Sequence, residues 1–167
     1  MIDNTVVTLQ IWDTAGQEKF QSLGYAFYRG ADCCALVYDL TNAQSFEHLT
    51  RWKNGFIENA GPSEPSTFPF VLLGNKLDQE ADKREVPTAK GQQWAKENND
   101  MMFYETSALE GVHVEDAFKV MAKAALKRDA EQQLTLPTTM GGADGNLKLT
   151  AKNDAQRGQT KSSSNCC

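Results

Sequence analysis

Three polar clusters contain the residue types that most often contact ligands, and each cluster directly follows a short apolar run. The clusters occupy residues 13–17, 75–78 and 105–109, after apolar runs at residues 6–11, 70–73 and 102–104. If the runs are parallel strands, their carboxyl ends meet at one edge of a sheet, which is where such folds bind ligands. We therefore expect the three clusters to converge on a single ligand.

The first cluster, Asp13-Thr14-Ala15-Gly16-Gln17, suits contacts with Mg²⁺ and a phosphate group. Asp13 at a strand end can hold the ion directly or through water. Gly16 lets the backbone approach a terminal phosphate closely enough for its N–H to donate to it. Gln17 has a donor and an acceptor on one neutral side chain, so it can orient a water for in-line attack. An isolated Asp-x-x-Gly is more often an ordinary turn.

The second and third clusters suit recognition of a guanine base. The Asp78 carboxylate can accept two parallel hydrogen bonds from the N1 and N2 donors of guanine, which adenine does not offer. Asn75 can hold the loop and the imidazole edge of the base, while the stem of Lys76 can cover the ring face. The small side chains of Ser107 and Ala108 leave backbone N–H groups open to the guanine carbonyl oxygen. Either cluster alone is more often a solvated turn, so only the combination is informative.

Alternating β and α patterns predict the elements that position these clusters. Strand-length apolar runs lie at residues 6–11, 35–38, 70–73 and 102–104, and helix-length segments separate them. Apolar residues recur at helical offsets from residue 114 to residue 126, and a second helix is predicted from residue 43 to about residue 59. The alternation predicts an α/β fold with a mostly parallel sheet and helices on both faces.

The composition is that of one ordinary domain with a tail. The chain has 167 residues, 40% of them hydrophobic, and a net charge of -5, which argues against a nucleic-acid-binding protein. Residues 134–167 contain no aromatic residue and are rich in small and polar types. We expect a domain at residues 1–133 and a disordered tail at residues 134–167. Neither a signal-peptide pattern nor a membrane-spanning run is visible, which favours a cytoplasmic protein.

The four cysteines form two adjacent pairs. This spacing disfavours a disulfide framework and does not match a zinc site. Cys33-Cys34 lies in an apolar run, where thiols usually act as small buried hydrophobes. Cys166-Cys167 ends the chain and is expected to be exposed.

In their order and spacing, the three clusters together resemble the Ras superfamily of small GTPases. The resemblance rests on residues 12–18, 75–78 and 105–108. Residues 27–31 and 36–39 look like the Rab branch, and residues 21–24, 27–34 and 68–74 are similar to its late-endosomal and vacuolar subgroup, Rab seven. The resemblance covers about residues 5–128, and the final Cys166-Cys167 also fits a Rab.

The resemblance implies a P-loop-type small GTPase that binds GTP or GDP with Mg²⁺ and switches vesicle traffic to the late endosome, lysosome or vacuole. Its implied partners are effector, exchange, activating and prenylation-escort proteins, and the protein is expected to be a monomer. Asp13 would hold the magnesium ion, and Gln17 would be catalytic. The implied nucleotide contacts are Asp13, Thr14, Ala15, Gly16, Gln17, Asn75, Lys76, Asp78, Ser107, Ala108 and Leu109.

The two terminal cysteines are the implied lipidation sites. Prenyl groups on Cys166 and Cys167 would attach the protein to the cytosolic face of the membrane, and two chains are what stable attachment requires. The alternative is an unmodified end with reactive thiols.

The chain departs from the family pattern in two places. The family's first strand, its G-x-x-x-x-G-K-[ST] phosphate loop, its first helix and its effector segment have no counterpart before Thr5, so we expect an amino-terminally truncated domain. Such a domain would bind GTP weakly, because the phosphate loop supplies most contacts to the charged phosphates. Leu109 stands where the family usually has Lys. The alternative function is therefore a non-catalytic interaction fragment.

Overall fold

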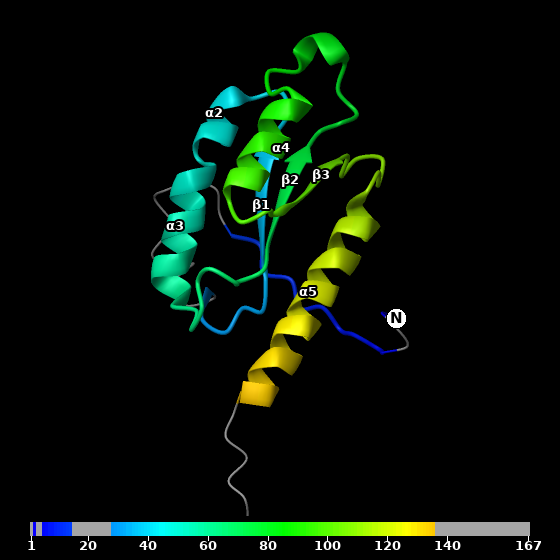
Figure 1. Cartoon of the computed structure of the whole chain (residues 1–167). Coiled ribbons are helices and arrows are strands. Elements are labelled where there is room, and N and C mark those ends of the chain that lie inside the picture. Colours follow the sequence, from blue (N-terminus) through cyan, green and yellow to red (C-terminus); the bar gives the residue numbers. More distant parts are fainter. Residues whose placement is uncertain (1, 3–4, 15–27, 136–167) are drawn as a thin grey trace, which may run out of the picture. The chain divides into compact units, whose positions relative to one another are not determined.

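The computed structural model describes residue 2, residues 5–14 and residues 28–135, with side chains as far as residue 131. The chain divides into one unit at Met1–Leu136 and a second at Pro137–Cys167. The second unit, which contains most of the predicted tail together with Cys166 and Cys167, lies outside the described residues. The first unit contains the elements β1 (Cys34–Asp39), α2 (Ala43–Glu47), α3 (Leu49–Ala60), β2 (Phe70–Asn75), a 3₁₀ turn (Ala81–Lys83), α4 (Thr88–Glu97), β3 (Met102–Thr106) and α5 (Val114–Thr135) (Figure 1).

Within the described residues, three parallel strands form a sheet in the order β1-β2-β3. The register pairs Asp39 of β1 with Asn75 of β2, and Asn75 with Thr106 of β3. The carboxyl ends of all three strands therefore lie in one row at one edge of the sheet (Figure 1). The strands predicted at residues 35–38, 70–73 and 102–104 are confirmed, each with slightly wider bounds.

Helices cover both faces of this sheet. On one face, Leu36 and Leu72 belong to a core with Phe46 of α2 and Phe56 of α3. On the other face, strand residues pack against α5; this second cluster consists of Val71, Leu73, Ala117 and Met121. Residues 70–74 of β2 are all buried, which explains why this strand reads as a continuous apolar run. The predicted α/β fold with helices on both faces is confirmed.

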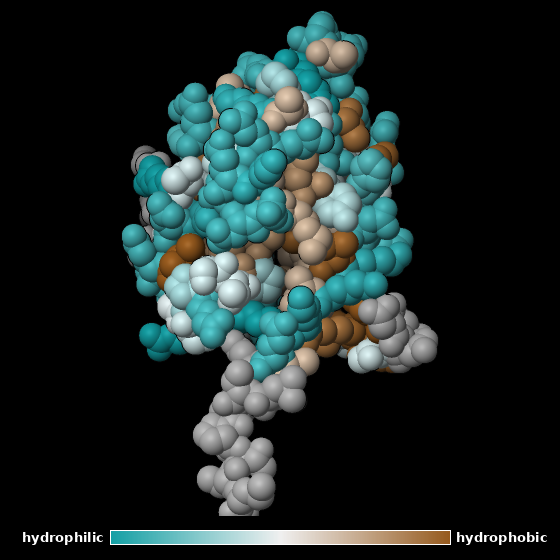
Figure 2. Space-filling view, in the orientation of Figure 1, coloured by the Kyte–Doolittle hydropathy of each residue, from teal (hydrophilic) through white to brown (hydrophobic). Residues whose placement is uncertain are grey.

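The predicted strand at residues 6–11 is wrong. Residues 6–14 have no regular secondary structure, and Val6 and Ile11 are 79% and 66% exposed. A strand needs a neighbour that takes its backbone hydrogen bonds, and this segment joins no sheet in the described part of the chain. Figure 2 shows one face of the molecule, on which hydrophobic patches interrupt a mainly hydrophilic surface.

The helix predicted from residue 43 to about residue 59 is two helices. The Asn42 side chain caps α2 by accepting a hydrogen bond from the Ser45 N–H at 3.2 Å. The chain then bends at His48, which ends α2 and precedes α3. At its other end α3 stops at Gly61, whose φ of 57° is in the left-handed region that favours glycine. The last helix begins at Val114 as predicted but continues to Thr135, past the predicted domain boundary.

Two glycines allow α4 and β2 to approach the ring of Tyr38 closely. A Cβ atom on Gly74 would lie 2.7 Å from the Tyr38 hydroxyl oxygen, and one on Gly91 would lie 2.6 Å from the same atom. The hydroxyl group is buried without a hydrogen-bond partner among the described residues. Burial, followed by the nearby Glu105 carboxylate, raises the pKa of Tyr38. The helix can therefore lie this close to the sheet only because position 91 has no side chain.

We predict that Gly91→Ala destabilises the fold although alanine favours helices. The added methyl group must displace the ring of Tyr38 or Phe103, at a cost of about 1–3 kcal/mol in the free energy of unfolding. The matched control is Gly55→Ala in α3, where nothing lies within 4 Å of an added Cβ. That change should stabilise the fold by about 0.5–1 kcal/mol through helix propensity alone. Urea unfolding of both variants tests the pair, and equal effects would contradict this account of α4.

Candidate functional site

The ends of β2 and β3 bring the second and third polar clusters together. The Ser107 hydroxyl donates to Asp78 Oδ1 at 2.6 Å, and the Ala108 N–H donates to Asn75 Oδ1 at 3.0 Å. The Thr106 hydroxyl also donates to Asn75 Oδ1, at 3.3 Å. Two loops that are distant in sequence thus form one hydrogen-bonded unit at the carboxyl edge of the sheet.

Asp78 is held as an accessible carboxylate. Its Oδ1 accepts from Ser107 and its Oδ2 accepts from the Gln79 side-chain amide at 2.8 Å. These hydrogen bonds, that of Ser107 first, hold the pKa of Asp78 below its usual value. A carboxylate has about four acceptor positions, so this group can still accept from further donors. The side chain is thus oriented and charged in the way that a ligand with two adjacent N–H groups requires.

Lys76 connects the same loop to the end of β1. Its ammonium group lies 2.7 Å from Asp39 Oδ2, and its backbone adopts a φ of 73°. Asp39 Oδ1 accepts from both the N–H and the hydroxyl of Thr41, each at 2.8 Å. Burial alone would raise the pKa of Asp39, but the bonds from Lys76 and Thr41 hold it below its usual value. The ion pair therefore connects the end of β1 to the loop after β2. That loop is itself hydrogen-bonded to the residues after β3.

Asp39 is a site residue that the sequence reasoning missed. It directly follows the strand predicted at residues 35–38, just as the three clusters follow their predicted strands. In the sheet it is paired with Asn75. The same rule would have found it, because strand-end polar residues in a parallel sheet share one edge.

The third cluster differs from its prediction in one respect. The Ala108 N–H was expected to be open, but it donates to Asn75 Oδ1. The reason is that the Asn75 side chain extends from the neighbouring strand in the same row. Leu109, which follows Ala108 in the chain, is 82% exposed.

The first cluster is described only in part. Asp13 and Thr14 are exposed residues in a segment without regular secondary structure. Ala15, Gly16 and Gln17 lie outside the described residues, as do Cys166 and Cys167. Within residues 2, 5–14 and 28–135, no group of three His, Cys, Asp or Glu side chains is placed to hold a metal ion. The structure thus brings together two of the three predicted clusters, and the residues present fit a base more fully than a phosphate or a metal.

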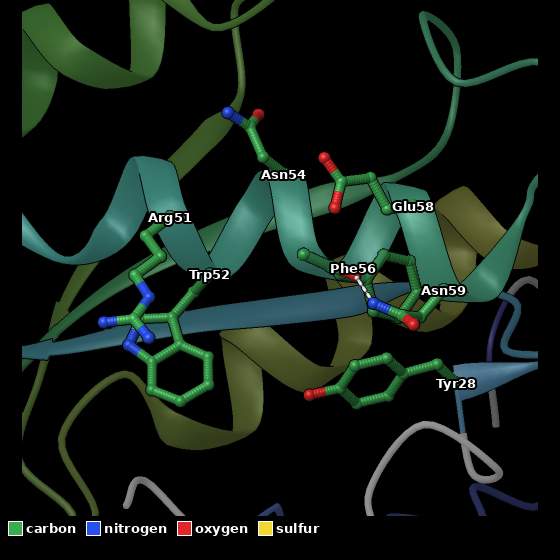
Figure 3. A pocket seen from close by; sticks show the side chains of 8 residues that line it. Tyr28, Arg51, Trp52, Asn54, Phe56, Glu58 and Asn59 are labelled. Carbon is green, nitrogen blue, oxygen red and sulfur yellow. Dashed lines mark hydrogen bonds between the residues drawn. The ribbon is translucent and has the colours of Figure 1, made fainter. Parts of the chain in front are cut away.

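A hollow of about 320 Å³ lies along α3, and none of the predicted site residues lines it. Figure 3 shows the rings of Tyr28 and Trp52 on one side of α3 and the side chains of Asn54 and Glu58 on the opposite side. It is lined by Tyr28, Arg51, Trp52, Asn54, Gly55, Phe56, Glu58 and Asn59. The chemistry-bearing residues therefore lie at the strand ends and outside this hollow.

Cys34, the first residue of β1, and Cys33, which precedes it, are unsuited to nucleophilic chemistry. Cys33 and Cys34 are half-buried, and burial raises the pKa of both thiols, that of Cys34 to about 12. The thiols are thus neutral at physiological pH and act as small apolar groups.

The chain is similar to known proteins over most of its length. A model of the Ras family matches residues 1–127. The chain is 51% identical over 152 residues to Ras-related protein Rab-7a of Paramecium octaurelia, an alignment that covers 91% of this chain and 73% of that protein. It is 56% identical over 134 residues to Ras-related protein Rab7 of Drosophila melanogaster, covering 80% of this chain and 64% of the relative.

A fungal relative shows the same similarity. The chain is 54% identical over 127 residues to Ypt/Rab-type GTPase ypt7 of Schizosaccharomyces pombe, covering 76% of this chain and 62% of the relative. This chain thus spans about two thirds of the length of these relatives.

We predict that the ion pair between Asp39 and Lys76 makes stability depend on pH. A carboxylate whose pKa is lowered by folding stabilises the fold above its unfolded pKa, and this contribution is lost as the pH falls through the folded pKa. Asp39→Asn should therefore be less stable than the wild type at about pH 7, and the difference should shrink as the pH falls below the usual pKa of an aspartate. Urea unfolding across this range measures the difference. Asp32→Asn, which changes an exposed carboxylate before β1, is the control and should show no such convergence.

Proposed function

Since this chain is a Rab7-like small GTPase of the Ras family, we propose that it binds GTP and GDP, hydrolyses GTP, and switches vesicle traffic to the late endosome, lysosome or vacuole. The family resemblance expected from the sequence is confirmed by the match to residues 1–127. The observation that carries the proposal is the hydrogen-bonded unit of Asn75, Asp78, Ser107 and Ala108. No finding supports the alternative of a non-catalytic interaction fragment.

The proposed base contacts follow from the side chains at the ends of β2 and β3. The free acceptor positions of Asp78 take the N1 and N2 donors of guanine, while Ser107 keeps the carboxylate oriented. Asn75 holds the two loops together through Ala108 and Thr106. The aliphatic stem of Lys76 can cover the ring face while its ammonium group stays with Asp39. Adenine offers no matching pair of donors, so selectivity lies in Asp78.

The hydrolytic role is proposed for the first cluster. Asp13 would hold Mg²⁺, and Gln17 would orient the attacking water. The chemistry that Mg²⁺ would supply there is positive charge that offsets the negative charge of the phosphate oxygens. Thr14, Ala15 and Gly16 would bring backbone N–H groups to the phosphates, a role that suits glycine at position 16 because no side chain blocks the approach.

Attachment to membranes is proposed to depend on lipidation of Cys166 and Cys167. In the described part of the chain, no helix combines the length and the apolar character that a membrane span requires. Two prenyl chains provide stable attachment where one gives only marginal binding. Recruitment would then involve the prenylation-escort, exchange, activating and effector proteins that the family implies.

We predict that Asp78→Ala removes the preference for guanine. The full chain should bind GDP more tightly than ADP, and the variant should lose about 10- to 100-fold in GDP affinity because two hydrogen bonds to a charged acceptor disappear. Its ADP affinity should change little. Asp82→Ala, which removes an exposed carboxylate from the adjacent 3₁₀ turn, is the matched control. Fluorescence titration with labelled GDP and ADP measures both, and a wild type that binds the two equally would contradict the proposal.

We predict a graded effect of the terminal cysteines on membrane attachment. The double variant Cys166→Ser with Cys167→Ser should incorporate no prenyl group and should leave the membrane fraction of cells. Each single variant should keep one chain and bind membranes weakly and reversibly. Cell fractionation with prenyl labelling provides the measurement. A double variant that stays on membranes would show that attachment has another cause.

A further inference from the structure

A short segment at residues 84–86 connects the loops that follow all three strands. The Leu40 carbonyl, directly after β1, accepts from the N–H groups of Glu85 at 2.9 Å and Val86 at 3.1 Å. The Glu85 carboxylate also accepts from the Ala43 N–H at 2.7 Å. This segment belongs to the loop after β2 that also contains Asp78. The loop after β2 is thereby fastened to the end of β1.

The connection to β3 is a bidentate ion pair between Arg84 and Glu105. Arg84 Nη1 donates to Glu105 Oε1 at 2.6 Å, and Nη2 donates to Oε2 at 3.0 Å. The side chains are only 27% and 15% exposed, so solvent screens the pair weakly. Nη1 also reaches the Thr88 hydroxyl at 3.3 Å. Paired hydrogen bonds of this kind fix the orientation of both groups as well as their separation.

Both members of the pair carry charge at neutral pH. Burial alone would raise the pKa of Glu105, but hydrogen bonds from Arg84 hold it below its usual value. The bond to Glu105 raises the pKa of Arg84. The main chain of Glu105 is held as well, since its carbonyl oxygen lies 2.8 Å from His113 Nδ1.

The pair links the loop after β2 to the end of β3. Arg84 follows Asp78 in that loop, and Glu105 lies within β3, two residues before Ser107. Nearby, the Leu77 N–H donates to the Thr106 carbonyl at 3.0 Å, and the Ser107 hydroxyl donates to Asp78. The ion pair and the contact between Asp78 and Ser107 thus hold the loop after β2 against the end of β3 and its following loop at two separate places.

We propose that Arg84 and Glu105 are positioning residues that set the guanine selectivity of this site. They touch no part of the base; they fix the distance between Asp78 on one loop and Ser107-Ala108 on the other. The inference rests on the proposed function, because it assigns a role within the guanine site. A purely structural ion pair would support folding without affecting selectivity, and the two roles can be separated by experiment.

The test uses the full chain and the double variant Arg84→Met with Glu105→Gln. Removing both charges avoids leaving one half-buried charge without a partner, which would endanger folding. Affinities for GDP and for inosine diphosphate are measured with Mg²⁺, since hypoxanthine lacks the 2-amino group that Asp78 would recognise. We expect GDP affinity to fall about 10-fold and the preference for GDP over inosine diphosphate to approach unity, because misplaced contacts lose their directional hydrogen bonds.

A second measurement does not need a nucleotide. Amide hydrogen exchange of Leu77 and Ala108, whose N–H groups bridge the two loops, should become about 10-fold faster in the double variant, while exchange in the core strands stays unchanged. Arg84→Lys keeps the charge but loses the bidentate hydrogen bonding of the guanidinium group. Its effects on nucleotide preference and on amide exchange should therefore be intermediate.

The matched control removes the exposed ion pair in the same loop. Lys83 and Glu80 lie 3.2 Å apart with side chains 55% and 72% exposed, and the variant Lys83→Met with Glu80→Gln should change neither selectivity nor exchange. A double variant at Arg84 and Glu105 that keeps the wild-type preference for GDP contradicts the positioning role alone. A wild type without that preference contradicts the proposed function, and with it the guanine role of the pair.

Discussion

The central strand β2 is hydrogen-bonded to a parallel strand on each side and covered on both faces, and the rest of the described fold depends on this arrangement. Its register places Asp39, Asn75 and Thr106 in one row, so the loops after the three strands begin at the same level. A shift of register by one residue would turn the buried side chains of β2 to the opposite faces, which the two hydrophobic clusters prevent. The polar network at the strand ends is therefore a product of apolar packing in the middle of the sheet.

The sequence predicts those parts of the fold in which a local pattern reports a local environment. Strand β2 could be predicted because a strand buried on both faces must be a continuous apolar run. The outer strands β1 and β3 contain exposed residues but also have apolar runs of strand length. The residues of the second and third clusters could be predicted because they directly follow such runs. The prediction of a strand at residues 6–11 was wrong because an apolar run indicates only an ability to pair, and pairing also requires a neighbouring strand.

The sequence does not predict contacts between distant residues of ordinary type. Arg84 reads as a surface charge, since nothing in its neighbourhood distinguishes it from charges that face solvent. Lys76 and Glu105 lie in predicted clusters, but the sequence assigns neither of them a partner within the protein. Their partners become evident only when the register brings the loops together. The same holds for Tyr38, whose ring needs a glycine from β2 and another from α4. In each case the deciding information is a distance between elements, which a pattern along the chain does not contain.

The backbone of Lys76 lies in the left-handed region at a φ of 73°, a conformation that costs a non-glycine residue of order 1 kcal/mol. The ion pair with Asp39 and the register of the sheet hold the residue in this conformation. The free-energy costs of this strain and of ordering the loop thus arise when the chain folds. At the proposed guanine site, a nucleotide would meet a loop that is already ordered, so more of its contact energy would remain as affinity.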